Sequence, residues 1–255
     1  MNYLLASATD IGTRKETNQD SVLIKRAIYG DNQIVLAVMC DGMGGLEKGE
    51  VASASLIKAF ARWFDQELPG ILSSHARESL LVGSWDDLIK EMNYKIGDYG
   101  KERRIRLGTT VTAMLFLEQD YYIAHVGDGR VYELSNRIMQ LTKDQTLVQK
   151  EVDEGLLSPE EIENDPRRSV LLQCVGSSDI LYPAYLKGTI GKDVVYLLCC
   201  DGFRHVISPA EIFNALSTEN MTDEQQMEKN IRQVIELVKD RGEQDNISAI
   251  VIRTW

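Results

Sequence analysis

One apolar segment that ends in an aspartate and a glycine-rich stretch limits the possible folds more than any other part of the chain. Residues 34–40 read IVLAVMC, and they continue directly into Asp41 and the sequence GMGG. An uninterrupted apolar run of this length predicts a strand buried on both faces. A hairpin turn needs only an Asp-Gly pair, so the additional glycines indicate close approach of the backbone to a bound ion or phosphate. The segment therefore predicts a carboxylate held at the end of a core strand.

Four further aspartates stand next to apolar segments in the same way. Two of them follow such a segment and two precede one; in chain order they are Asp20, Asp128, Asp201 and Asp245. A single Asp-Gly pair is usually a turn and nothing more. Carboxylates this far apart in the sequence can meet only through folding, and Mg²⁺ and Mn²⁺ prefer clusters of oxygen ligands. The recurrence therefore predicts a site for a hard divalent cation.

The distribution of residue types predicts an α+β fold. Ten segments rich in β-branched and aromatic residues are expected to be strands: 3–8, 21–28, 33–40, 110–118, 121–126, 131–135, 138–141, 186–189, 194–200 and 247–253. Helical periodicity covers 47–67, 84–104 and 222–240, and a shorter helix is expected after Ser208. Ser84 with Asp87 is expected to cap the second of these helices. Because strands and helices occur in groups, we expect two stacked antiparallel sheets flanked by helices in a single domain, residues 1–255.

Taken together, these motifs resemble those of the metal-dependent Ser/Thr protein phosphatases of the PP2C (PPM) type, most of all the bacterial single-domain members. The matching segments occur in the family's order: Asp41-Gly-Met-Gly-Gly, Gly108-Thr-Thr, Gly127-Asp-Gly-Arg, Asp201-Gly and Asp245-Asn. The resemblance covers Asp10 to about Ile252. It implies an αββα sandwich with its metal site at one end of the sheets, and a flap subdomain at about 144–185, where the sequence is polar and rich in turn residues. The expected substrates are phosphoserine and phosphothreonine in proteins, those modified by a Ser/Thr kinase.

The resemblance also implies a set of metal ligands. Asp41 would bridge two Mn²⁺ or Mg²⁺ ions, and the backbone carbonyl of Gly42 would bind one of them. Asp201 and Asp245 would bind the other ion, and Asp20 would hold its place through metal-bound waters. Asp128, sharing Asp201, matches the ligand of a weaker third metal. A metal-activated water would then attack the phosphorus in line, without a phosphoenzyme intermediate.

Two positions depart from the family pattern. The family's phosphate-binding arginine lies five positions before the first aspartate, which in this chain is Lys15, with Arg14 one residue further. We favour Arg14 because guanidinium binds phosphate through two parallel hydrogen bonds, but Lys15 could serve as a point charge. Met43 stands where many eukaryotic relatives have His, so protonation of the leaving group would fall to a metal-bound water or to no protein group. Arg130 is expected to pair with a nearby carboxylate.

Composition excludes several classes of protein. The formal net charge of −11 argues against a nucleic-acid-binding protein. No apolar run reaches 18 residues, and the N-terminus lacks the basic start of a signal peptide, so we expect a cytoplasmic protein without a membrane span, and a monomer. The four cysteines complete no zinc pattern, and none leads a glycine-rich loop closed by arginine, which excludes a cysteine-dependent phosphatase.

Two alternatives stay open. The chain could be a non-catalytic regulator or scaffold of the same fold, because fold alone does not establish activity. The loss of metal aspartates would mark such a protein, and this chain has all of them. A nuclease or nucleotide phosphatase with two metals is the other alternative, although a nuclease would be expected to present a basic groove.

Overall fold

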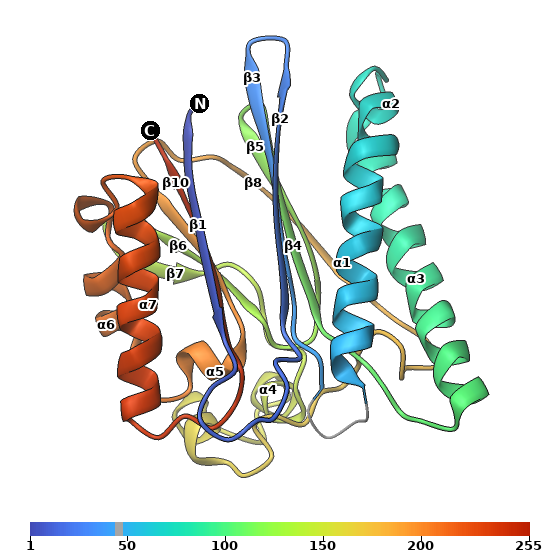
Figure 1. Ribbon diagram of the computed structural model, residues 1–255, viewed down its shortest axis with the longest axis vertical. Coiled ribbons are helices and arrows are strands. Elements are labelled where there is room, and N and C mark those ends of the chain that lie inside the picture. Colours follow the sequence, from blue (N-terminus) through green and yellow to red (C-terminus); the bar gives the residue numbers. More distant parts are fainter. Residues whose placement is uncertain (44–47) are drawn as a thin grey trace.

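The protein consists of two five-stranded antiparallel sheets packed face to face, with helices on both outer faces (Figure 1). The computed structural model describes residues 1–43 and 48–255. The first sheet has the strand order β1-β10-β9-β6-β7, formed by Tyr3–Asp10, Ile247–Thr254, Val195–Cys199, Arg130–Leu134 and Ile138–Gln140. The second has the order β2-β3-β4-β5-β8, formed by Ser21–Tyr29, Asn32–Cys40, Val111–Leu117, Asp120–Val126 and Ala184–Thr189. All ten predicted strands are present, and the predicted α+β class is confirmed.

Strand β3 shows why the apolar run in its sequence is uninterrupted. Successive side chains of a strand point to opposite faces. Val35, Ala37 and Met39 lie in the core between the two sheets. The alternating residues Ile34, Leu36, Val38 and Cys40 instead pack toward the helices on the outer face. Both faces of β3 are therefore buried, as the sequence predicts, and its C-terminal end is held in a fixed position.

The helices cover the outer face of each sheet (Figure 1). Helices α1 (Gly49–Gln66), α2 (Leu68–Leu72) and α3 (Arg77–Arg103) pack on the second sheet. Helices α6 (Pro209–Leu216) and α7 (Glu224–Asp240) pack on the first sheet, and the short α5 (Asp201–Arg204) follows β9. The predicted first helix began at Glu47, which lies outside the described residues, as do Gly44 and Gly45 of the glycine-rich motif. No described helix combines the length and the apolar character needed to cross a membrane.

The predicted start of the second long helix at Ser84 is wrong. Helix α3 begins at Arg77, so Ser84 lies inside the helix and does not cap it. Its hydroxyl accepts a hydrogen bond from the Trp63 indole at 2.9 Å and donates one to the Leu81 carbonyl at 2.9 Å. Serine is favoured at this interior position, despite its low helix propensity, because its hydroxyl accepts the hydrogen bond of a tryptophan indole on a neighbouring helix. The predicted start of α6 is confirmed, because Ser208 forms a capping box with Glu211.

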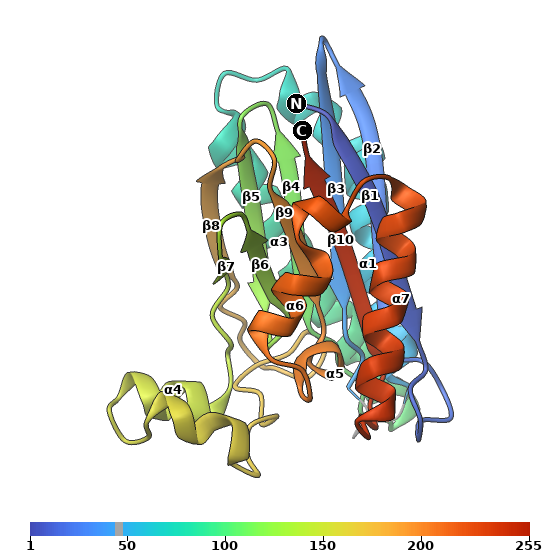
Figure 2. The ribbon, with the colours of Figure 1, turned by 90° about the vertical axis from the view of Figure 1, so that its left-hand side faces the viewer.

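The polar segment after β7 extends away from the two sheets (Figure 2). It contains α4 (Leu147–Asp153) and a short 3₁₀ helix, Pro159–Asn164, before the chain returns to the edge strand β8. Asp144 at its beginning is buried, whereas most residues from 154 to 172 are partly or fully exposed. We refer to residues 144–183 as the flap. Figure 1 shows α5 and the flap at the end of the sandwich opposite to both chain termini.

Candidate metal centre

Antiparallel pairing brings the predicted aspartates to one end of the two sheets. Ser21 pairs with Cys40, so Asp20 and Asp41 flank the same pair of residues at the end of β2 and β3. Asp128 follows β5, Asp201 begins α5 directly after β9, and Asp245 lies just before β10. The carboxylates of all four other aspartates contribute Coulombic repulsion at Asp41. The structure therefore brings together the five carboxylates that the sequence predicted would meet.

The backbone around Asp41 is fixed by two threonines of the segment before β4. The backbone N–H of Asp41 donates to the Thr110 hydroxyl at 3.0 Å, and the Thr110 N–H donates to the Asp41 carbonyl at 2.9 Å. The Thr109 hydroxyl also donates to that carbonyl, at 2.9 Å. This explains the Gly-Thr-Thr motif as a support for Asp41. Gly42 is required for steric reasons, because a Cβ there would lie 2.5 Å from the Gln19 carbonyl oxygen.

The carboxylates are costly to ionise in the absence of a cation. Burial, with Asp201 and Asp245 nearby, raises the pKa of Asp20 from 3.8 to about 6. Burial and the charge of Asp201 raise the pKa of Asp128 to about 7. The pKa of Asp41 is raised well above its ordinary value, first by burial and then by Asp20 and Asp201. Buried carboxylates that lie close together and have raised pKa values indicate a functional site.

Several oxygens of the cluster are buried without a hydrogen-bond partner. They are both carboxylate oxygens of Asp20 and one of Asp201. Unpartnered buried oxygens are unusual, and an all-oxygen donor set suits Mg²⁺ or Mn²⁺. Within residues 1–43 and 48–255, no three acidic, histidine or cysteine side chains already stand in the arrangement of a bound metal. The residues present fit a divalent cation by their chemistry, and mutual repulsion favours their separation when no cation is there.

A histidine and a glutamate hold two of the aspartates in place. His205 Nε2 lies 3.3 Å from a carboxylate oxygen of Asp201, and His205 Nδ1 lies 3.4 Å from one of Glu243. Glu243 Oε1 in turn accepts the backbone N–H of Gln244 at 2.7 Å and of Asp245 at 2.9 Å. Neither His205 nor Glu243 was among the site residues predicted from the sequence. The one signal for Glu243 is its position two residues before Asp245, which does not by itself indicate a contact with His205.

Two arginines bind Asp144 at the start of the flap, and one of them also contacts Asp128. Arg130 donates from Nε and Nη2 to the two carboxylate oxygens of Asp144, each at 2.8 Å. This is the carboxylate partner that the sequence predicted for Arg130. Arg204 donates to the Asp128 carbonyl at 3.2 Å and to Asp144 at 3.3 Å. Sequence reasoning missed Arg204, because a basic residue three positions after Asp201 carries no signal of burial.

His125 is part of the core and not of the reacting site. It is fully buried in β5, and its Nδ1 lies 3.0 Å from the Thr112 hydroxyl. Burial lowers the pKa of His125 to about 4. The imidazole is therefore neutral at physiological pH, and its role is structural.

Lys15 and Arg14 lie in different environments. The Lys15 ammonium is 2.6 Å from a carboxylate oxygen of Asp245. Burial opposes its charge, but this hydrogen-bonded pair, with Asp41 and Asp201 nearby, raises the pKa of Lys15 overall. Arg14 is exposed, and the described part of the chain holds no ion pair to it. The structure thus brings Lys15, rather than Arg14, to the carboxylate cluster.

Comparisons with known proteins show the family to which this chain belongs. Residues 12–251 match the sequence model of the family described as "Protein phosphatase 2C". The chain is 31% identical over 247 residues to the serine/threonine protein phosphatase PstP of Mycobacterium tuberculosis, covering 96% of this chain and 44% of PstP. It is 28% identical to protein phosphatase PhpP of Streptococcus pneumoniae, covering 96% and 94% of the two chains. The chain thus spans less than half the length of PstP and nearly all of PhpP.

Solved structures give the same result. The serine/threonine phosphatase Stp1 from Staphylococcus aureus superposes with a TM-score of 0.83 at 28% identity, covering 98% of this chain and 94% of that one. The catalytic domain of PstP in complex with two manganese ions superposes with a TM-score of 0.77 at 30% identity, covering 99% of both chains. Family match, fold and the order of the aspartate motifs lead to one conclusion: this chain belongs to the protein phosphatase 2C family.

Proposed function

We propose that this protein is a metal-dependent phosphatase that hydrolyses phosphoserine and phosphothreonine in proteins. The main support is the group of five aspartates at one end of the sandwich, with buried oxygens that have no hydrogen-bond partner. The family relationship supports the same reaction, because relatives that cover nearly the whole chain are protein phosphatases. The two manganese ions in the related PstP catalytic domain support a two-metal site.

The aspartates would divide the metal-binding roles among them. Asp41 would contact two ions, and the Gly42 carbonyl would bind one of them. Asp201 and Asp245 would hold the second ion, and Asp20 would hold its place through metal-bound waters. Asp128 would contribute to a weaker third site. When bound, Mn²⁺ or Mg²⁺ supplies acidification of water and neutralisation of charge on the phosphoryl group.

Lys15 is the better candidate to bind the substrate phosphate. Its ammonium already lies at the carboxylate cluster through Asp245, whereas Arg14 faces solvent. Binding of metal at Asp245 would free the ammonium from this pair, and a phosphate beside the metals would offer it a new anionic partner. Lysine supplies this charge as a point rather than as a two-pronged guanidinium. The orientation of the phosphate would therefore depend more on the metals than in relatives with arginine.

A phosphocysteine intermediate finds no support in the environment of the thiols. Cys40, Cys199 and Cys200 are buried, and burial raises the pKa of Cys199 to about 12 and that of the other two well above the usual range. Thiols held in this way do not ionise near neutral pH and are poor nucleophiles. Water is therefore the nucleophile that fits the site.

Release of phosphate from matched phosphothreonine and phosphotyrosine peptides tests the proposal. We expect release with Mn²⁺ or Mg²⁺, a preference for phosphothreonine, and no release in excess chelator. Asp41→Asn and Asp201→Asn should each lower kcat by at least ~10² at saturating metal, because each removes charge from a direct metal ligand. Full activity in chelator, or a trapped phosphorylated side chain, would refute the mechanism. A folded, metal-loaded protein that releases no phosphate from either peptide would favour the non-catalytic alternative.

A further inference from the structure

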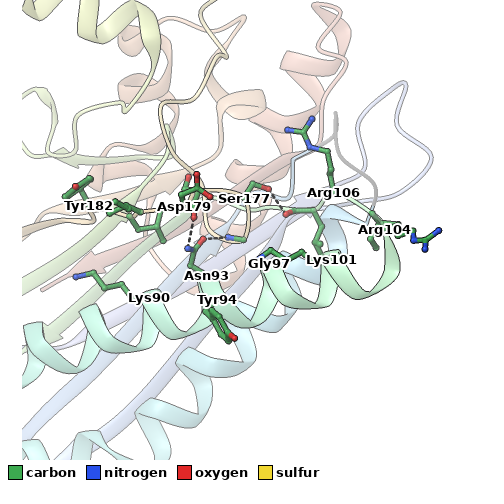
Figure 3. Close-up of a pocket in the computed structure, with 17 residues that line it drawn as sticks. Lys90, Asn93, Tyr94, Gly97, Lys101, Arg104, Arg106, Ser177, Asp179 and Tyr182 are labelled. Carbon is green, nitrogen blue, oxygen red and sulfur yellow. Dashed lines mark hydrogen bonds between the residues drawn. The ribbon is translucent and has the colours of Figure 1, made fainter.

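A groove with positively charged walls lies next to the metal centre, between the second half of α3 and the last part of the flap. The pocket has a volume of about 760 Å³ (Figure 3). We call it the basic groove and define it by Lys90, Lys101, Arg104, Arg106 and residues 176–182. Figure 3 shows Lys90 at one end and Arg104 and Arg106 at the other, with Ser177 and Asp179 between them.

The charge of the groove is opposite to that of the whole protein. The chain has a net charge of −11, yet four cations line the groove and Asp179 is the one carboxylate among its described lining residues. Lys90 and Lys101 each pair with an aspartate of the same helix, at 2.7 and 3.6 Å. Arg104 and Arg106 are exposed, and the described residues hold no ion pair to either. A local excess of positive charge on an acidic protein favours an anionic partner at this place.

The walls of the groove are fixed by hydrogen bonds. The Asn93 side chain of α3 donates to the Ser178 carbonyl at 2.8 Å and accepts the Gly176 N–H at 2.7 Å. The Ser177 hydroxyl donates to the Leu107 carbonyl at 2.8 Å. Arg104 ends α3 in the left-handed conformation, with φ of 57°, which turns the chain toward Arg106. The groove therefore exists before any ligand binds, which lowers the entropic cost of binding.

The wall of the groove is joined by a backbone hydrogen bond to the segment that follows Asp41. Leu107 lines the groove, and the carbonyl of the next residue, Gly108, accepts the backbone N–H of Met43 at 3.1 Å. The groove wall is thus one hydrogen bond from the backbone two residues after Asp41. Ile180 and Tyr182 add exposed apolar surface, with 66% and 73% of their area accessible. A peptide with its phosphorylated residue at the metals would place neighbouring residues in this groove.

We propose that the basic groove binds acidic residues next to the phosphorylated residue of a protein substrate. This inference rests on the proposed phosphatase function and adds a sequence preference to it. The metal centre would already be occupied by the phosphate and five aspartates, so a preference for acidic neighbouring residues requires positive charge outside that centre. Arg104 and Arg106 provide that surface within reach of the metal centre.

The test compares two phosphothreonine peptides, one flanked by Asp and Glu and the other by Asn and Gln. We expect kcat/KM of the unaltered protein to be about tenfold higher for the acidic peptide, mainly through KM, because several exposed charge pairs each contribute modestly. The double variant Arg104→Glu/Arg106→Glu should lose this preference. Turnover of p-nitrophenyl phosphate normalises each preparation for its content of active enzyme.

Arg103→Glu is the matched control. Arg103 belongs to the same basic run but stacks on the Tyr99 ring at 3.8 Å and does not line the groove. The Arg103→Glu variant should keep the preference for the acidic peptide. In the unaltered protein, raising the salt concentration should reduce that preference. Equal kcat/KM for the two peptides, or a preference that survives the double variant, would overturn the groove proposal and leave the phosphatase proposal intact. Absence of hydrolysis of both peptides by the metal-loaded protein would instead overturn the phosphatase proposal and this inference with it.

Discussion

Replacing Asp20 by Asn should stabilise the metal-free protein, although it removes a residue of the metal centre. In the absence of metal the Asp20 carboxylate is buried, both of its oxygens are without a hydrogen-bond partner, and burial raises its pKa to about 6. The unfolded chain ionises this group at its ordinary value of 3.8. At pH 8 the native state therefore carries an unfavourable charge that the unfolded state does not feel.

The size of the effect follows from the two pKa values. Their difference corresponds to about 3 kcal/mol at 1.36 kcal/mol per pH unit. The Asn amide also needs hydrogen-bond partners in this buried place, which offsets part of the gain. We therefore expect Asp20→Asn to raise the free energy of unfolding by about 1–3 kcal/mol, or Tm by about 3–10 °C for a chain of this size.

The pH dependence has a definite sign. Between pH 8 and about pH 5, Asp20 and Asp128 take up protons in the native state, with pKa values of about 6 and 7, while the unfolded chain stays ionised. A native state that binds more protons becomes more stable as the pH falls. Chelator-treated protein should therefore be more stable at pH 6 than at pH 8, and the Asp20→Asn variant should show a smaller difference.

Urea unfolding at pH 8 in excess chelator measures this prediction. Asp144→Asn is the matched control, because Asp144 is also buried but pairs with Arg130 and Arg204, and its pKa is lowered. Its loss leaves two largely buried guanidinium groups without their carboxylate partner and should cost about 3–5 kcal/mol. With saturating Mn²⁺ the unaltered protein should become more stable than Asp20→Asn, because it gains more free energy of unfolding from metal binding. Destabilisation by Asp20→Asn in chelator would refute the reasoning from carboxylate repulsion.

Three further predictions concern individual side chains. Lys15→Ala should lower kcat/KM for a phosphopeptide by roughly 10–10³ through loss of a charge-assisted contact, whereas Arg14→Ala should cost little; steady-state kinetics showing the opposite order would reassign the phosphate contact. Glu243→Gln should weaken Mn²⁺ binding about 10–100-fold in titration calorimetry, because His205 loses the anion that orients it, and an unchanged affinity would contradict that role. Iodoacetamide should leave phosphatase activity unchanged over hours, since the cysteines are buried; rapid inactivation would count against water as the nucleophile.

The elements predicted most accurately are those whose sequence pattern follows from local geometry. Strand β3 was recognisable because burial of both its faces requires an uninterrupted apolar run, and the start of α6 was recognisable because Ser208 and Glu211 cap it. The start of α3 was not recognisable, because Ser84 has the composition of a cap and its actual role depends on Trp63. That contact joins residues 21 positions apart, and the sequence around Ser84 does not indicate it.

The sequence by itself determined the two-sheet architecture and the set of five aspartates, because apolar strands that are followed or preceded by an aspartate form a pattern visible along the chain. Only the tertiary structure decided which of two adjacent cations faces that cluster. Arg14 and Lys15 are equivalent as loop residues, and Lys15 is selected by a carboxylate 230 positions away. The contact of Glu243 with His205 and the positive charge of the basic groove were decided in the same way. Such features depend on the direction of side chains brought together from distant segments, and that direction is fixed only when the sheets and helices have packed.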